Sequence, residues 1–186
     1  MQEAVMSGSV RDWRYSLWLG LLVAASVVFT LGMACAAPLA AFGAAAALTL
    51  PRRDALLVAL GIWFANQAVG FAVLGYPLTA DCLAWGAILG VVAVLSTVTP
   101  QAVSQRLHGH GGLLRAITAF AASFAVYEGG LYLVTLTVMG GGLDAYAPAM
   151  VLRVFEINAL AFAGLVAVSQ AGRLLTPAVT PVLARP

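Results

Sequence analysis

The chain has 186 residues, of which 62% are hydrophobic and 9% are charged. A water-soluble domain of this length carries about a quarter charged residues, so a soluble globule is excluded and lipid surrounds most of the chain. The formal net charge of +2 is too small, and the arginines are too scattered, for a nucleic-acid partner. The composition predicts a single integral membrane domain covering residues 1–186.

Six apolar blocks are near the length of a membrane-spanning helix, because about 20 helical residues cross about 30 Å of hydrocarbon. They cover about residues 15–33, 34–50, 55–74, 82–98, 116–139 and 148–169. The predicted fold class is therefore all-α, a polytopic helical bundle with six transmembrane helices.

The first two blocks form the least certain boundary, because residues 15–50 contain no charge. Only Pro38 and the small residues before it indicate a turn, so we expect a tight helical hairpin. Its turn must lie at the membrane surface or be buried in protein. The alternative is a cleaved signal peptide that ends near Cys35, followed by one span.

The arginines provide an independent test of the span count. If the amino terminus is inside, every arginine except Arg153 falls in a cytoplasmic segment, while Asp81 and Asp144 fall in external loops. This is the distribution that the positive-inside rule predicts for short loops. We therefore expect both termini in the cytoplasm. The absence of lysine and the abundance of Ala, Val, Leu and Gly suggest a bacterial inner membrane.

The sequence contains no recognisable motif for metal binding or catalysis. The longest expected loop, residues 100–114, contains His108 and His110, but no further ligand lies nearby, so we expect a flexible loop and no metal. Cys35 and Cys82 lie in apolar surroundings and are interpreted as buried packing residues. Since HExxH, GxSxG and P-loop motifs do not occur, we expect no enzyme, no catalytic residue and no cofactor.

Small residues recur at four-residue spacing in three places. The series are Gly20 with Ala24, then Ala37, Ala41 and Ala45, and then Gly86 with Gly90. Such faces let helix backbones approach closely in lipid. We interpret them as internal packing faces, with docking onto another membrane subunit as the alternative.

Several polar residues interrupt the apolar spans. They are Asn66, Gln67, Tyr127, Glu128, Arg153, Glu156 and Asn158. Ionisable groups within a membrane cost at least a few kcal/mol each unless paired or hydrated, so they tend to face the bundle interior and mark ligand or ion pathways. From a rise of about 1.5 Å per residue, the groups from different spans all lie in the outer half of the membrane. Their agreement in depth predicts a shared polar pocket that faces outward.

The spacing assigns partners within this pocket. Arg153 and Glu156 are three residues apart, so they lie on one helix face and we expect them to pair. Glu128 then remains unpaired, and burial favours its protonated form unless a cation is bound. Aromatic walls are expected from Trp63, Tyr127 and Tyr132.

The predicted substrate-binding residues are Trp63, Asn66, Gln67, Tyr127, Glu128, Arg153 and Glu156. The alternative interpretation is structural. In it the charges form a buried salt-bridge cluster, and the amides make hydrogen bonds that hold the helices in register.

The chain resembles the substrate-binding membrane subunit, or S component, of energy-coupling factor (ECF) vitamin transporters. The likeness lies in small size, six spans, cytoplasmic termini, small-residue helix faces and an outward polar pocket. The stretch that is similar in texture runs from Trp63 through Asn66, Gln67, Gly70 and Gly75 to Tyr76 and Pro77, and continues with Trp85, Gly86 and Gly90.

This resemblance implies a protein that captures a vitamin-like small molecule outside the cell for import. A transmembrane coupling subunit with ATPases would supply the energy. In that family an Ala-xxx-Ala pattern on the first helix docks on the coupling subunit, and Gly20 with Ala24 is a loose equivalent here. Two other functions remain open. One is a non-transporting membrane subunit or assembly factor, and the other is a proton- or cation-coupled carrier.

Overall fold

The structure is a computed structural model that describes residues 2–33, 37–107, 109–139 and 142–174. These ranges are helical and contain no strand, which confirms the all-α fold class. The α-helices are α1 (Gln2–Met33), α2 (Leu39–Thr49), α3 (Arg52–Ala72), α4 (Ala80–Arg106), α5 (Gly112–Val134) and α6 (Pro148–Leu174). A π-helical turn, Thr135–Met139, and a 3-10 turn, Leu143–Tyr146, lie between α5 and α6.

Five helices in the described part of the chain are long and apolar enough to cross a membrane: α1, α3, α4, α5 and α6. The chain is thus a multi-pass membrane protein, but six full-length spans are not present in the described residues. The block expected at 34–50 instead forms α2, whose 11 residues extend about 16 Å, roughly half of the hydrocarbon thickness. Pro51 stops this helix because proline has no amide hydrogen to continue it.

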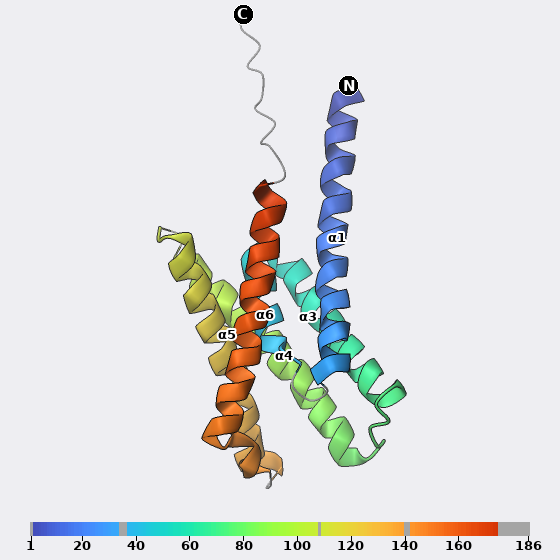
Figure 1. Ribbon diagram of the computed structural model, residues 1–186, viewed down its shortest axis with the longest axis vertical. Helices are drawn as coiled ribbons and strands as arrows, with labels where there is room; N and C mark the ends of the chain where they lie inside the picture. Colours follow the sequence, from blue (N-terminus) through green and yellow to red (C-terminus); the bar gives the residue numbers. More distant parts are fainter. Residues whose placement is uncertain (1, 34–36, 108, 140–141, 175–186) are drawn as a thin grey trace, which may run out of the picture.

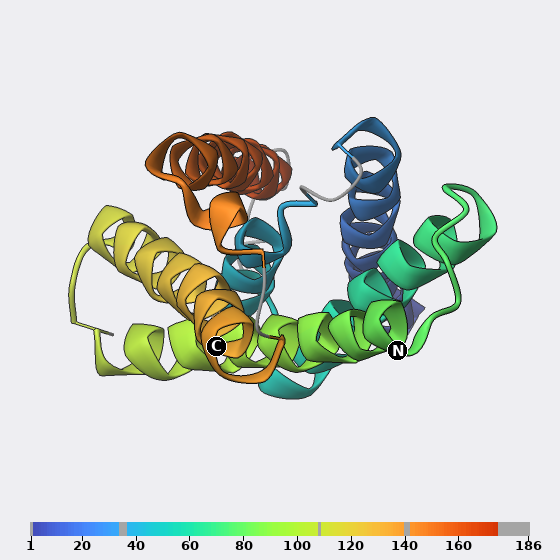
Figure 2. The same ribbon diagram turned by 90° about the horizontal axis from the view of Figure 1, so that it is seen from below.

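The short helix α2 lies in the middle of the bundle, with α3, α4, α5 and α6 around it (Figure 2). Leu39–Ala46 are all buried. Such surroundings permit a half-length helix, because its free backbone ends do not meet lipid. Ala37 and Pro38 are buried as well, so this part of the expected hairpin turn lies inside the protein. Residues 34–36 of that turn, including Cys35, lie outside the described ranges.

Asn158 of α6 fixes the start of α2. Its Oδ1 accepts a hydrogen bond of 3.1 Å from the amide of Ala41, and its Nδ2 donates to the carbonyl of Val154 at 2.9 Å. Ala41 is the third residue of α2, and an amide in the first turn has no partner within its own helix. With 0% of its surface exposed, Asn158 has a structural role here.

A second polar contact joins α2, α4 and α5 around one carbonyl oxygen. Pro100 lies inside α4 and cannot donate a hydrogen bond to the carbonyl of Ser96. The hydroxyl of Ser123 lies 2.7 Å from this oxygen and 2.8 Å from the carbonyl of Ala40. A Cβ added at Gly43 would lie 2.9 Å from the same Ser96 oxygen, so only glycine lets α2 approach α4 this closely.

Because Ser123 compensates for Pro100, α4 continues to Arg106 instead of ending near residue 98. The prediction of a long loop over residues 100–114 is therefore wrong, since only residues 107–111 separate α4 from α5. His110 is exposed in this connection, and His108 lies outside the described ranges.

The bundle has two different ends (Figure 1). One end, here called the arginine-rich end, holds the start of α1, the α2–α3 turn, the α4–α5 connection and the end of α6. Arg52, Arg53, Arg106 and Arg115 lie there. The other end, here called the cavity end, holds the α3–α4 and α5–α6 connections with Asp81 and Asp144. The arginines are thus one-sided as expected, and the cytoplasmic location of their end stays a prediction.

The three small-residue series have different surroundings. Ala37, Ala41 and Ala45 are buried within the bundle. Gly86 and Gly90 of α4 lie against the side chains of Gln67 and Trp63 of α3, and a Cβ at either glycine would collide with them. Internal packing is therefore confirmed for these two series. Gly20 and Ala24 are exposed on α1, and Gly20 has nothing within 4 Å of an added Cβ.

Candidate functional site

The larger of two neighbouring cavities lies at the cavity end between α5, α6 and the turn that joins them. Its volume is about 450 Å³, and its lining includes Tyr127, Glu128, Leu131, Tyr146, Met150 and Arg153. We call it the α5–α6 cavity. Small-molecule sites are commonly about 300–1,000 Å³, mostly apolar, with a few convergent polar groups. The α5–α6 cavity has both the size and the mixed lining of such a site.

The smaller cavity lies between α3, α4 and the start of α2. Its volume is about 230 Å³, and its lining includes Ala37, Asn66, Gln67, Tyr76, Trp85 and Tyr127. We call it the α3–α4 cavity. Tyr127 lines both cavities and is only 5% exposed, so its side chain stands between them.

The structure places most of the predicted substrate-binding residues on these walls. Asn66, Gln67, Tyr127, Glu128 and Arg153 line one or both cavities. The agreement in depth deduced from the sequence thus corresponds to proximity in space. Trp63 and Glu156, the remaining two, line neither cavity.

Trp63 is used for packing between α3 and α4. Its Nε1 donates to the carbonyl of Gly86 at 2.7 Å, and its indole ring occupies the space that a Cβ at Gly90 would need. The indole nitrogen therefore already has its hydrogen bond within the protein.

The two amides of the α3–α4 cavity also contact each other. Nδ2 of Asn66 donates to Oγ1 of Thr30 on α1 at 3.1 Å, and Nε2 of Gln67 donates to Oδ1 of Asn66 at 3.3 Å. Thr30 gives its own proton to the carbonyl of Ser26 at 2.8 Å. This chain of hydrogen bonds orients the amides, and it also joins α1 to α3.

The three charged residues of the predicted site have no ionic partner in the described ranges. Glu128 is half-buried, while Arg153 and Glu156 are exposed. The expected pair of Arg153 with Glu156 does not form. A separation of three residues displaces two side chains by about 60° around a helix, and here Arg153 borders the cavity whereas Glu156 lies on the outer face.

Tyr146, which the sequence reasoning missed, takes the place on the cavity wall that was expected for Tyr132. The side chain of Tyr132 is 42% exposed and packs edge-on against Tyr146, with 5.1 Å between ring centres. The hydroxyl of Tyr146 lies 3.3 Å from Oγ1 of Thr135, which itself donates to the carbonyl of Leu131. Tyr146 is therefore the donor in this contact. No periodic pattern marks it, because it belongs to the short 3-10 turn.

Glu128 acts on Tyr146 through its charge. Burial raises the pKa of the Tyr146 hydroxyl, the hydrogen bond with Thr135 lowers it in part, and the charge of Glu128 raises it further. Tyr146 therefore stays protonated at physiological pH and offers the cavity a neutral aromatic wall.

Cys82 at the start of α4 and Tyr76 in the α3–α4 loop also line the α3–α4 cavity. Cys82 is only half-buried and lines this cavity, which differs from the buried packing position expected for it. Tyr76 packs its ring over Gly70, so the α3–α4 loop folds back onto α3. Tyr76 was not among the predicted site residues, because no helical period indicates the direction of a side chain in this loop.

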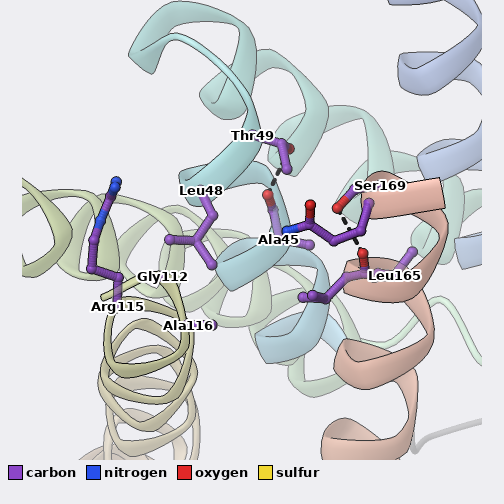
Figure 3. A pocket seen from close by; sticks show the side chains of 10 residues that line it. Ala45, Leu48, Thr49, Gly112, Arg115, Ala116, Leu165 and Ser169 are labelled. Atoms are coloured by element: carbon purple, nitrogen blue, oxygen red, sulfur yellow. Dashed lines mark hydrogen bonds between the residues drawn. The ribbon is translucent and has the colours of Figure 1, made fainter. Parts of the chain in front are cut away.

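A third cavity, at the arginine-rich end, has a different character (Figure 3). It measures only about 120 Å³ and is lined by residues such as Ala45, Thr49, Arg115 and Ser169. Thr49 donates to the carbonyl of Ala45 at 2.7 Å, and Arg115 donates to the hydroxyl of Ser104 at 3.0 Å. The side chains of Thr49, Arg115 and Ser169 are therefore hydrogen-bonded inside the protein, and the volume of this cavity is small for a nutrient.

Comparisons with protein-family models, with curated proteins and with solved structures find no match for this chain. Function is therefore inferred from the geometry of the cavities.

Proposed function

We propose that this chain binds a small, vitamin-like nutrient in the two cavities of the cavity end and serves its import across a bacterial inner membrane. The observation that supports this proposal is the convergence of polar residues from three helices on adjoining cavities. Asn66 comes from α3, Glu128 from α5 and Arg153 from α6, and Tyr127 links the cavities. Polar groups within membranes are expensive to keep, which favours a role beyond packing.

The lining suggests the chemistry of the ligand. Glu128 has no partner in the described chain, so a cationic or hydrogen-bond-donating group would compensate its carboxylate. The faces of Tyr127 and Tyr146 can support a cation near it. The amides of Asn66 and Gln67 provide hydrogen bonds for a second, neutral part of the same compound.

The resemblance to ECF S components supports the remainder of the proposal. In that arrangement a transmembrane coupling subunit with ATPases drives release, which suits a chain without a nucleotide motif. The exposed Gly20 and Ala24 face of α1 is available for such a subunit. Small residues one turn apart permit close approach of a neighbouring helix.

The first experiment measures which small molecule stays bound. Protein purified gently in nanodiscs is analysed by native mass spectrometry, and the retained compound is then titrated back onto protein freed of it. Glu128→Gln is expected to weaken binding by about tenfold or more, since a charge-assisted contact is worth about 1.5–3 kcal/mol. Asp144→Asn, an exposed acid of the same end, is the control and should bind as the unmodified protein does.

Asn66 needs a separate control because it also bonds to Thr30. Asn66→Ala removes the amide from the cavity, its bond to α1 and the acceptor of Gln67. Thr30→Val leaves the amide in the cavity but removes its bond to α1, together with the bond of Thr30 to the Ser26 carbonyl within α1. Binding lost in Asn66→Ala but kept in Thr30→Val supports a contact with the ligand. Unchanged binding in both Glu128→Gln and Asn66→Ala, or no retained compound at all, contradicts the proposed site.

The second candidate function is a membrane subunit without transport activity, in which the polar residues only fasten helices. It is favoured by the interhelical hydrogen bonds of Trp63, Asn66 and Asn158. This function predicts stoichiometric membrane partners on purification and no bound small molecule.

A further inference from the structure

The outer face of α6 carries charge that the described chain does not neutralise. Glu156 is exposed, lines no cavity found in the described ranges, and has no ionic partner or hydrogen bond there. It lies about 12 Å along α6 from Pro148, within the apolar segment Pro148–Ala171. A carboxylate that faces lipid at this depth is unfavourable unless a partner compensates its charge.

Arg153 lies one turn away, on the border between this face and the α5–α6 cavity. It also has no ionic partner in the described chain. A long arginine side chain can reach toward lipid head groups, but the shorter Glu156, deeper in the membrane, cannot do the same. Lipid alone therefore leaves one of the two charges uncompensated.

The same face is otherwise built from small residues. Its exposed positions are Ala149, Arg153, Glu156, Leu160, Ala163, Gly164 and Ala167. Spacings of three and four residues put them on one side of the helix. Gly164 has nothing within 4 Å of an added Cβ, and Leu160 is 75% exposed. Figure 2 shows α6 at the edge of the bundle.

We infer that this face of α6 binds α6 of a second copy of the chain. Around a two-fold axis along the membrane normal, Arg153 of each copy faces Glu156 of the partner subunit, and the contact occurs twice. The two residues differ by about 4.5 Å in height, which an arginine side chain can bridge. A different protein would need an acidic group opposite Arg153 and a basic group opposite Glu156, whereas a second copy of this face supplies both.

Pairing between the two copies would also change the charge at the edge of the α5–α6 cavity. Because Arg153 also borders the α5–α6 cavity, the partner subunit's Glu156 would neutralise the cation at its edge. Glu128 then remains as the uncompensated charge of the cavity. Dimer formation itself requires no ligand, so it can be tested whether or not the chain transports anything.

Cysteine cross-linking in native membranes tests the interface. In a chain whose Cys35 and Cys82 are replaced by alanine, Ala167→Cys lies on the proposed interface and Ala125→Cys lies on the exposed side of α5. Oxidation with copper phenanthroline is expected to link Ala167→Cys into a dimer of twice the chain mass and to leave Ala125→Cys unlinked. Equal linking at both positions, no linking at Ala167→Cys, or linking to a protein of another mass overturns the inference.

Charge exchange identifies the contact within that dimer. Arg153→Glu and Glu156→Arg each place like charges opposite each other, so each should lower the cross-linked fraction of Ala167→Cys by about tenfold. The chain that carries both exchanges restores opposite charges and should recover the cross-link. Loss in both single variants without recovery in the double variant contradicts the proposed pairing.

A size variant gives a test that does not depend on charge. Gly164→Leu fits the single chain, because nothing surrounds this position, but it separates two closely packed helices. It should abolish the dimer in light scattering of nanodisc samples, while Gly20→Leu on α1, equally unobstructed, should not. An unchanged dimer in Gly164→Leu would place the interface elsewhere.

Discussion

The middle of the bundle and the cavity end contain polar residues of the same kinds, but their partners differ. Around α2, the side chains of Asn158 and Ser123 make hydrogen-bond contacts with backbone amide and carbonyl groups. At the cavity end, Glu128 and Arg153 have no ionic partner in the described chain and border a cavity of about 450 Å³. Glu128 and Arg153 lie about 7.5 Å nearer the cavity end than Ser123 and Asn158 do. Both groups are within membrane-spanning helices, so partners and free volume distinguish fastening from binding.

The largest expected effect concerns Asn158, which together with Ser123 forms the fastening group around α2. Asn158→Leu keeps the volume but removes the acceptor of the Ala41 amide, which leaves that amide unpaired in a dry interior. We expect the free energy of unfolding to fall by about 1–3 kcal/mol, measured by thermal unfolding in nanodiscs. Thr137→Val, which removes an exposed hydroxyl bonded within its own helix, should change little. If both variants melt alike, Asn158 does not hold α2.

The next effect concerns the carbonyl of Ser96. Ser123→Ala leaves this oxygen without its donor, and we expect a loss of about 1–2 kcal/mol in the free energy of unfolding. Adding Pro100→Ala supplies a new amide donor within α4, so the double variant should be more stable than Ser123→Ala alone. A double variant that is less stable still would show that Pro100 is needed for another reason.

The smallest expected effect is a gain in stability, and it concerns Glu128 of the α5–α6 cavity. Glu128→Gln replaces a half-buried carboxyl group that has no ionic partner by a neutral amide. The ligand-free protein should therefore gain up to about 1 kcal/mol in stability while it loses ligand binding. Thermal unfolding of ligand-free samples measures the gain. A clear loss of stability would show that Glu128 is part of the fastening group instead.

Much of the fold could be predicted because hydropathy and the placement of arginines can be read directly from the sequence. The blocks at 55–74, 82–98, 116–139 and 148–169 each fall within or close to an observed helix. The half-length α2 could not be predicted, since an apolar run of 17 residues looks the same whether lipid or protein surrounds it. The Ser96 carbonyl that Pro100 leaves without an amide donor is contacted by Ser123, which is 27 residues away in the sequence, so the continuation of α4 could not be predicted.

Part of the site could be predicted because the depth of a residue in the membrane follows from its position along the span. Depth placed Asn66 and Glu128 on a common level, and the structure places both beside Tyr127. Whether a residue reaches the cavity depends on how its helix is rotated in the bundle, so Arg153 borders the cavity and Glu156, about 60° away on the same helix, does not. Tyr146 and Tyr76 reach the cavities from short connections, where no helical period indicates a direction.

Accessibility of Ile157, a residue of the α5–α6 cavity wall about 14 Å along α6 from Pro148, tests most directly whether a hydrated cavity opens outward. Intact cells expressing Ile157→Cys, with Cys35 and Cys82 replaced by alanine, are treated with a membrane-impermeant maleimide. Leu133→Cys, which is exposed on the outside of α5, serves as the lipid-facing control. We predict rapid labelling of Ile157→Cys from outside and little labelling of Leu133→Cys. Equal resistance of both, or labelling of Ile157→Cys only from the cytoplasmic side, would contradict an outward-facing binding cavity.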